Sequence, residues 1–137
     1  MIKRVILIAL AAACGQLAAG DLASATTAKF VRVILLGTGV KTVACADRDL
    51  AWDLGQLGVV LDPDSKVAWA DTEKDVARFA KGGKLVICGS KALLASGATL
   101  AVAAEGGHPV IFANLRALAA TNMTLPDNIL KLAKVAQ

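Results

Sequence analysis

Short apolar runs alternate with amphipathic stretches through the middle of the chain. The runs at residues 40–46, 66–70 and 84–89 have the length and composition of buried strands. Residues 48–57 carry Leu at helical spacing, and a second helix is predicted at 73–80. Strand, helix, strand, helix, strand in this order predicts right-handed crossovers and a parallel sheet covered by helices.

The pattern changes after residue 90. Residues 99–104 and 109–113 read as two strands joined by the tight turn Glu105-Gly106-Gly107-His108, which predicts an antiparallel hairpin. The apolar run at 29–36 fits either a buried strand or the first helix of the fold. The sequence therefore predicts a single three-layer α/β domain with a mixed, mostly parallel sheet that ends in a C-terminal antiparallel hairpin.

A pair of helices is expected to close the domain. Asn114 can cap the first helix, which should end at Asn122, because Asn tolerates the left-handed conformation that follows many helices. Thr124 and Asp127 have the spacing of a capping box for the second helix. Its apolar positions fall on one face: Leu125, Ile129, Leu132, Ala133 and Ala136.

The N-terminal segment has the features of an export signal. Lys3 and Arg4 precede nine apolar residues at 5–13, too few to span a bilayer, and small-residue cleavage motifs follow at 17–19 and 23–25. We interpret residues 1–25 as a signal peptide, with a retained apolar N-terminal segment as the alternative. The domain then comprises residues 26–137, and the expected location is periplasmic or secreted.

Composition narrows the function classes. The chain has 137 residues, enough for one domain with its own core, and 56% of them are hydrophobic while only 4% are aromatic. The formal net charge is +4, but the basic residues are scattered and no aromatic residues are interleaved with them. Nucleic-acid binding is therefore not expected.

No catalytic, cofactor-binding or metal-binding residues are predicted, and the chain is not expected to be an enzyme. The turn Gly37-Thr38-Gly39 lacks a P-loop's Gly directly before Lys41, and a strand follows it rather than a helix. His108 is the single histidine and is predicted in a solvated turn. The carboxylates at helix starts and turns are explained by capping and solvation, although some lie at the ligand-binding edge of a parallel sheet: Asp47, Asp49, Asp53, Asp62, Asp64 and Asp71.

Three residues stand out as candidates for function. Trp52 lies about 160 degrees from the Leu stripe of its helix, so it is either a partner contact or a side chain lying on a neighbouring loop. Trp69, within a predicted strand, is expected in the core. Cys45 and Cys88 remain after export; their even number permits a disulfide, whereas their apolar surroundings favour buried free thiols.

The C-terminal third resembles the closing motif of the YfiR/HmsC-like periplasmic proteins. That motif runs Phe-x-Ile-Asn-Leu, two or three small residues, Gly-Leu, a Ser-rich cap and Leu-Leu-x-Leu-Ala. The chain is similar to it without a gap, with Asn122 at the Gly position and Pro126-Asp127 at the serines; the matching positions are Asn114, Leu115, Ala117, Met123, Ile129, Leu130, Leu132 and Ala133. The turn Gly106-Gly107 and Phe112 resemble the preceding hairpin, and residues 30–36 and 40–50 resemble the family's first helix and strand.

The resemblance implies a non-enzymatic regulatory protein that binds another envelope protein. In the family, that partner is the periplasmic sensor domain of a membrane-bound diguanylate cyclase, and binding is often by a dimer under redox control through cysteines. Here only Cys45 and Cys88 could serve that control. A homo-oligomer is expected. Two alternatives stay open: a self-assembling structural or secretion-linked envelope subunit, and a module that binds a small ligand at the strand ends.

Overall fold

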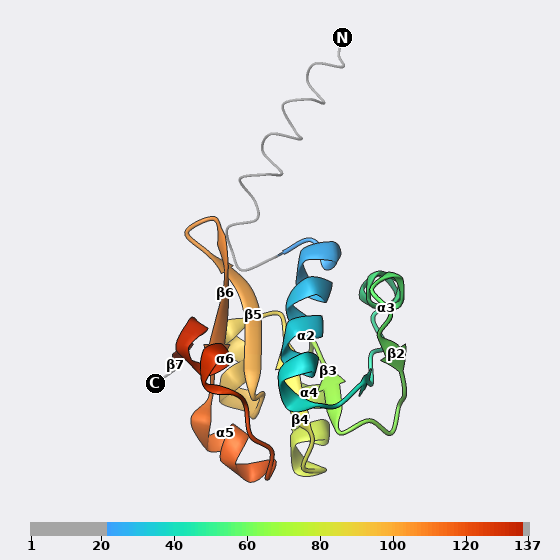
Figure 1. The fold of residues 1–137 in the computed structure, drawn as a ribbon. Coiled ribbons are helices and arrows are strands. Elements are labelled where there is room, and N and C mark those ends of the chain that lie inside the picture. Colours follow the sequence, from blue (N-terminus) through green and yellow to red (C-terminus); the bar gives the residue numbers. More distant parts are fainter. Residues whose placement is uncertain (1–21, 136–137) are drawn as a thin grey trace.

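A computed structural model describes residues 22–135, which form a single α/β domain (Figure 1). The helices are α2 (Ser24–Thr38), α3 (Arg48–Gln56), α4 (Glu73–Lys81), the 3-10 helix η1 (Lys91–Ser96), α5 (Leu115–Ala120) and α6 (Asp127–Leu132). The strands are β1 (Thr42–Val43), β2 (Val60–Leu61), β3 (Val67–Trp69), β4 (Leu85–Cys88), β5 (Leu100–Glu105), β6 (His108–Ala113) and β7 (Ala133–Val135).

The sheet is mixed and mostly parallel, as the sequence predicts. Five strands pair in the order β3-β4-β5-β6-β7, and within this group only β5 and β6 are antiparallel. β1 and β2 form a parallel pair, which a single bridge between Ala44 and Ala68 joins to β3. Strand β2 therefore lies at one end of the layer and β7 at the other.

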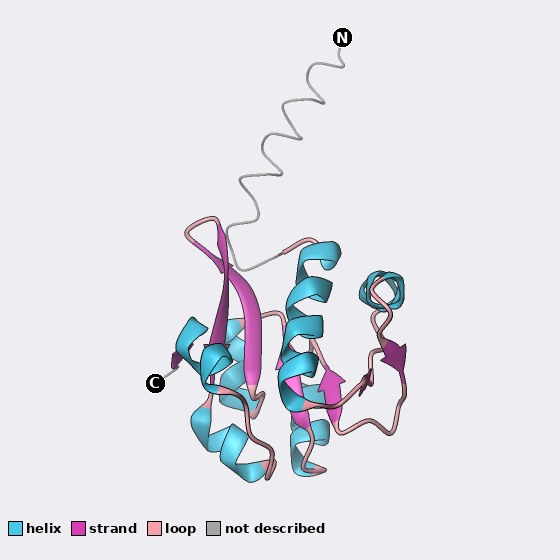
Figure 2. Ribbon diagram, viewed as in Figure 1, coloured by secondary structure: helices cyan, strands magenta, loops and turns pink. Residues whose placement is uncertain are grey.

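Helices cover both faces of the sheet (Figure 2). One core packs the strands against α2, α3 and α6, and its largest fully buried side chains include Ile34, Leu54 and Ile87. The other core lies on the opposite face, where α4 and η1 pack against side chains such as Val86 and Phe112. Because successive residues of a strand point to opposite faces, the apolar strands serve both cores.

The apolar run at 29–36 belongs to a helix. Ala28, Val31, Ile34 and Leu35 are buried at helical spacing, and Gly39, with φ of 79°, ends α2 in the left-handed conformation. The strand predicted at 40–46 is shorter than expected, because only Thr42–Val43 and the bridge at Ala44 have strand partners.

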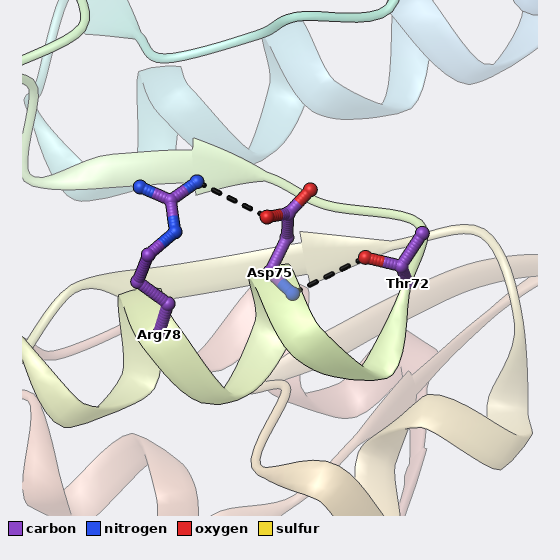
Figure 3. Close-up of polar contacts among 3 residues, drawn as sticks. All are labelled: Thr72, Asp75 and Arg78. Carbon is purple, nitrogen blue, oxygen red and sulfur yellow. Dashed lines mark hydrogen bonds and ion pairs between the residues drawn. The ribbon is translucent and has the colours of Figure 1, made fainter.

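Local capping sets the start of α4 (Figure 3). The side chain of Thr72 accepts a hydrogen bond from the backbone N–H of Asp75 at 3.2 Å. The Asp75 carboxylate in turn pairs with Arg78 one turn later, at 3.1 Å. A polar start of this kind satisfies an N–H group that the first turn of a helix leaves without a backbone partner.

The C-terminal hairpin is confirmed. Gly106 and Gly107 join β5 to β6 with φ of 61° and 82°, which only glycine adopts readily in succession, and His108 is exposed opposite Glu105. The first closing helix also forms as predicted. The Asn114 side chain accepts the Ala117 N–H at 3.1 Å, and Asn122 has a φ of 58°.

The second closing helix differs from the prediction in two ways. Thr124 does not cap it: the helix begins at Asp127, Pro126 occupies the cap position, and no side chain makes the cap bond. Leu125 and Ile129 are buried as expected, but Leu132 is 70% exposed. The chain leaves the helix at Ala133, where residues 133–135 pair with the edge of β6, and that pairing satisfies backbone groups of this short segment.

The predicted signal segment lies mostly outside the described residues. Helix α2 begins at Ser24, within the last two residues of the predicted segment 1–25. Within residues 22–135 no helix combines the length and apolarity that a membrane crossing requires.

Candidate functional site

Trp52 lies on the outer side of α3 and is 69% exposed. Leu50 and Leu54 on the same helix are buried, so the Trp occupies the face turned away from the core. Val60 and Leu61 of β2 are also exposed, at 58% and 42%, and Leu61 lines the same shallow depression as Trp52. We call these three residues, Trp52, Val60 and Leu61, the Trp52 patch.

The position of α3 is set by polar contacts at its start and on its flank. Asp47 caps the helix by accepting the Leu50 N–H at 3.0 Å. On the flank, the Ser24 hydroxyl donates to the Asp53 carboxylate and ties α3 to the start of α2. With the inner face packed on the core through Leu50 and Leu54, little freedom remains for Trp52 to turn inward.

Strand β2 supplies the part of the patch that the sequence did not reveal. Val60 and Leu61 pair with Thr42 and Val43 on one side, and no other strand of the described chain pairs with their second side. An open edge exposes N–H and C=O groups that can pair with another chain. Two apolar residues before Asp62-Pro63-Asp64 resemble a turn entry, and only the parallel pairing with β1 identifies them as an edge strand.

The disulfide between Cys45 and Cys88 does not form; both thiols are free. Ala44 bridges to Ala68 and Ala68 pairs with Val86, so β3 lies between the segments that carry the two cysteines. The side chains also face opposite ways, since Cys45 packs against the core under α2 and Cys88 belongs to the core under α4. Two thiols on opposite faces, with a strand between them, cannot meet the geometry of a disulfide.

Both thiols have low reactivity. Burial raises the pKa of Cys45 and of Cys88 from 9.0 to about 11 in each case. Each also donates a hydrogen bond to a nearby carbonyl, Cys45 to Asp47 at 3.6 Å and Cys88 to Ser90 at 3.2 Å. Because the thiolate is the reactive form, neither residue has the character of a redox sensor.

A small polar cavity lies at the carboxyl ends of the parallel strands. Its volume is about 130 Å³, and its lining includes Asp47, Asp71, Trp69 and Gly89. A side chain at position 89 would lie 3.3 Å from both the Asp71 carboxylate and the Trp69 ring, so Gly89 keeps this space open. The structure thus brings together two of the predicted strand-end carboxylates, as parallel strands place their ligand edge on one side.

Trp69 lines this cavity and has a buried, unpaired ring nitrogen among the described residues. The residue is 7% exposed, as expected for the core, but its Nε1 is buried without a hydrogen-bond partner among residues 22–135. A buried unpaired donor is destabilising by about 1–3 kcal/mol. The sequence predicts Trp69 in the core and gives it no other role; the Asp two residues after this Trp, at the end of a strand, is the signal that points to the cavity.

The other polar candidate residues within residues 22–135 do not come together in a catalytic or metal-binding arrangement. His108 is exposed at the hairpin. Within residues 22–135, no group of three or more His, Cys, Asp and Glu side chains is arranged to hold a metal ion.

A second, larger hollow lies between η1, the end of α4 and α5. This groove has a volume of about 1080 Å³. Its charged lining residues are Lys84, Lys91 and Arg116, and the rest of its lining is mostly small or apolar, including Leu94 and Val135.

Comparison with known proteins places the chain only at the level of fold. No protein-family model matches it, and no curated protein matches it. Its structure is similar to a crystal structure of a conserved domain protein from Vibrio cholerae O1 biovar eltor, with a TM-score of 0.61 and 14% sequence identity. The match covers 85% of this chain and 61% of the other, so the chain spans about three fifths of that protein's length.

Proposed function

We propose that this chain is an exported, non-enzymatic regulatory protein, similar to the YfiR-like proteins, that acts by binding another envelope protein through the Trp52 patch. The proposed partner is the periplasmic sensor domain of a membrane-bound diguanylate cyclase. The observation that carries the proposal is an exposed Trp beside an open sheet edge with two exposed apolar side chains. Trp is enriched among the residues that dominate binding energy at protein interfaces.

The geometry favours a partner that adds an extended segment to β2. The free side of Val60 and Leu61 offers backbone hydrogen bonds, and Trp52 offers a large apolar surface directly beside them. Main-chain pairing supplies affinity in such complexes and neighbouring side chains supply specificity. The cost of holding Trp52 in place is low, since α3 is already fixed by Asp47 and by the Ser24–Asp53 contact.

Binding of the purified chain to the purified sensor domain tests the proposal. We expect Trp52→Ala to weaken binding at least about tenfold, a loss of roughly 1.4 kcal/mol or more. Leu36→Ala is the matched control, because Leu36 on α2 is 72% exposed and lies outside the patch. Unaltered binding by Trp52→Ala would rule out the patch, and no binding by the wild-type chain would rule out this partner.

A second candidate function, binding of a small polar ligand, is favoured by the cavity at the strand ends. A ligand with a hydrogen-bond acceptor could satisfy the buried Nε1 of Trp69. About 130 Å³ suits a ligand of only a few heavy atoms. A thermal-shift screen of small alcohols and amino alcohols tests this candidate, because two Asp carboxylates and no cation of residues 22–135 line the cavity. A ligand present at 100 times its dissociation constant stabilises the folded chain by about 2.7 kcal/mol. A screen without any shift would count against the candidate.

A further inference from the structure

The groove between η1, α4 and α5 carries unbalanced positive charge. Lys84, Lys91 and Arg116 line it, and no carboxylate of residues 22–135 does. Both ion pairs found among residues 22–135 lie elsewhere, Arg78 with Asp75 and Lys134 with Glu105. None of the three groove cations forms an ion pair with a carboxylate of residues 22–135, although Lys91 lies near enough to Glu105 to help Lys134 lower the pKa of that carboxyl.

Two of the three cations are positioned by contacts that leave them able to attract an anion. Lys84 donates a hydrogen bond to the Ser65 carbonyl, and the Lys91 ammonium lies 4.9 Å from the centre of the Phe112 ring. Arg116 is exposed on the first turn of α5. Small side chains such as Ala92 and Ala117 line the groove, which permits close approach of a bulky side chain.

The segment of the chain that carries the Trp52 patch has a net charge of the opposite sign. Residues 47–71 contain six Asp against Arg48 and Lys66, a net charge of −4. Residues 72–135 contain eight basic and four acidic residues, a net charge of +4. Asp47, Asp49 and the single cation Arg48 line the depression beside Trp52, and Asp62 directly follows Leu61. One polypeptide thus carries an acidic apolar surface and a basic hollow.

These two surfaces involve different elements, and part of the groove lies across the molecule from the patch. Figure 1 shows α3 and β2 on one side of the molecule and α5 and β7 on the other. One copy therefore cannot bring its own patch into its own groove, but it can present each surface to a different neighbour.

We propose that the groove binds the Trp52 patch of a second copy of this chain, with the surrounding Asp side chains facing Lys84, Lys91 and Arg116. Charge complementarity within one sequence identifies the occupant as another copy. Trp52 supplies the apolar anchor, and a groove of about 1080 Å³ has room for an indole with its neighbours. The contact joins two different surfaces, so it is heterologous and extends head to tail into rings or open chains.

This inference rests on the same patch as the proposed function and adds its regulation. Self-association covers Trp52, so it competes with the partner protein. Exposed charges are screened over about 10 Å at 0.1 M salt, so the association weakens as salt rises.

Sedimentation velocity of the chain as recovered from cells, without any partner, tests the proposal. We expect the average mass to rise with protein concentration at low salt and to fall on addition of salt. Trp52→Ala and Arg116→Glu each remove one of the two surfaces, so each variant alone stays monomeric. Their equimolar mixture forms a dimer and nothing larger, because one intact patch meets one intact groove.

Lys74→Glu is the matched control, since it makes the same charge change on exposed α4 away from the groove, and it should associate like the wild-type chain. A monomeric wild-type chain at all concentrations, a monomeric mixture, or equal loss in Lys74→Glu would each overturn the proposal. Arg116→Glu should also keep or improve affinity for the partner protein. That readout separates the two ideas, because a failed partner assay leaves the sedimentation result standing.

Discussion

Gly37 and Gly55 form a matched pair that tests how α6 docks on α2. Both lie in helices and neither has a positive φ, so on helix propensity alone Ala would stabilise each position by about 0.8–1 kcal/mol. Their surroundings differ. A Cβ at position 37 would lie 2.4 Å from Ile129 Cδ1 and 3.0 Å from the Pro126 ring, whereas position 55 has open space.

The loss of stability expected for Gly37→Ala follows from these contacts. Carbon atoms pack best at about 3.5–4.0 Å, so Ile129 or the whole helix must retreat by roughly 1 Å. Overpacking of this kind costs about 1–3 kcal/mol. We therefore expect Gly37→Ala to be less stable than Gly55→Ala by about 1–3 kcal/mol, with Gly55→Ala slightly more stable than the wild-type chain.

Urea unfolding followed by far-UV circular dichroism measures the difference. With a slope of about 1–3 kcal/mol per molar urea, the two midpoints should separate by about 1 M. Ile129→Val removes the clashing methyl group, so its cost in the Gly37→Ala background should be smaller than in the wild-type chain. Equal stabilisation by the two Gly→Ala changes would refute the close contact between α2 and α6.

Three further predictions concern buried groups. Thr99 is 1% exposed and its hydroxyl accepts the Val86 N–H at 3.1 Å, so Thr99→Val should cost about 1–3 kcal/mol in urea unfolding. Thr99→Ser keeps the hydroxyl and should cost only about 0.8 kcal/mol for the lost methyl group. Equal losses of stability in the Val and Ser variants would contradict the hydrogen bond from the Val86 N–H to the Thr99 hydroxyl. The raised pKa of Cys45 and Cys88 should slow alkylation at pH 8 about 100-fold relative to the urea-unfolded chain, measured by peptide mass spectrometry. Alkylation of the folded chain at the rate of the unfolded chain would contradict the burial of the thiols. Because the pKa of each thiol is raised in the folded state, the contribution of the two thiols to the free energy of unfolding is complete below pH 9.0 and is lost as pH rises towards about 11.

Local signals in the sequence determined much of the fold. The Gly106-Gly107 turn, the Asn114 cap and the left-handed Asn122 each depend on a few adjacent residues, and each forms as predicted. The Leu spacing of α3 also fixed the outward position of Trp52, because helical geometry alone separates it from Leu50 and Leu54. These features could be predicted because their energetics involve only neighbours along the chain.

Tertiary structure decided what the local signals left open. Residues 29–36 became a helix and residues 133–135 a strand because of the surfaces they meet, β6 in the second case. Tertiary contacts also decided the candidate sites. Insertion of β3 between the segments of Cys45 and Cys88 excludes their disulfide, and pairing with β1 makes Val60 and Leu61 the open edge beside Trp52. Strand order and edge exposure come from contacts between residues far apart in sequence, which no local pattern encodes.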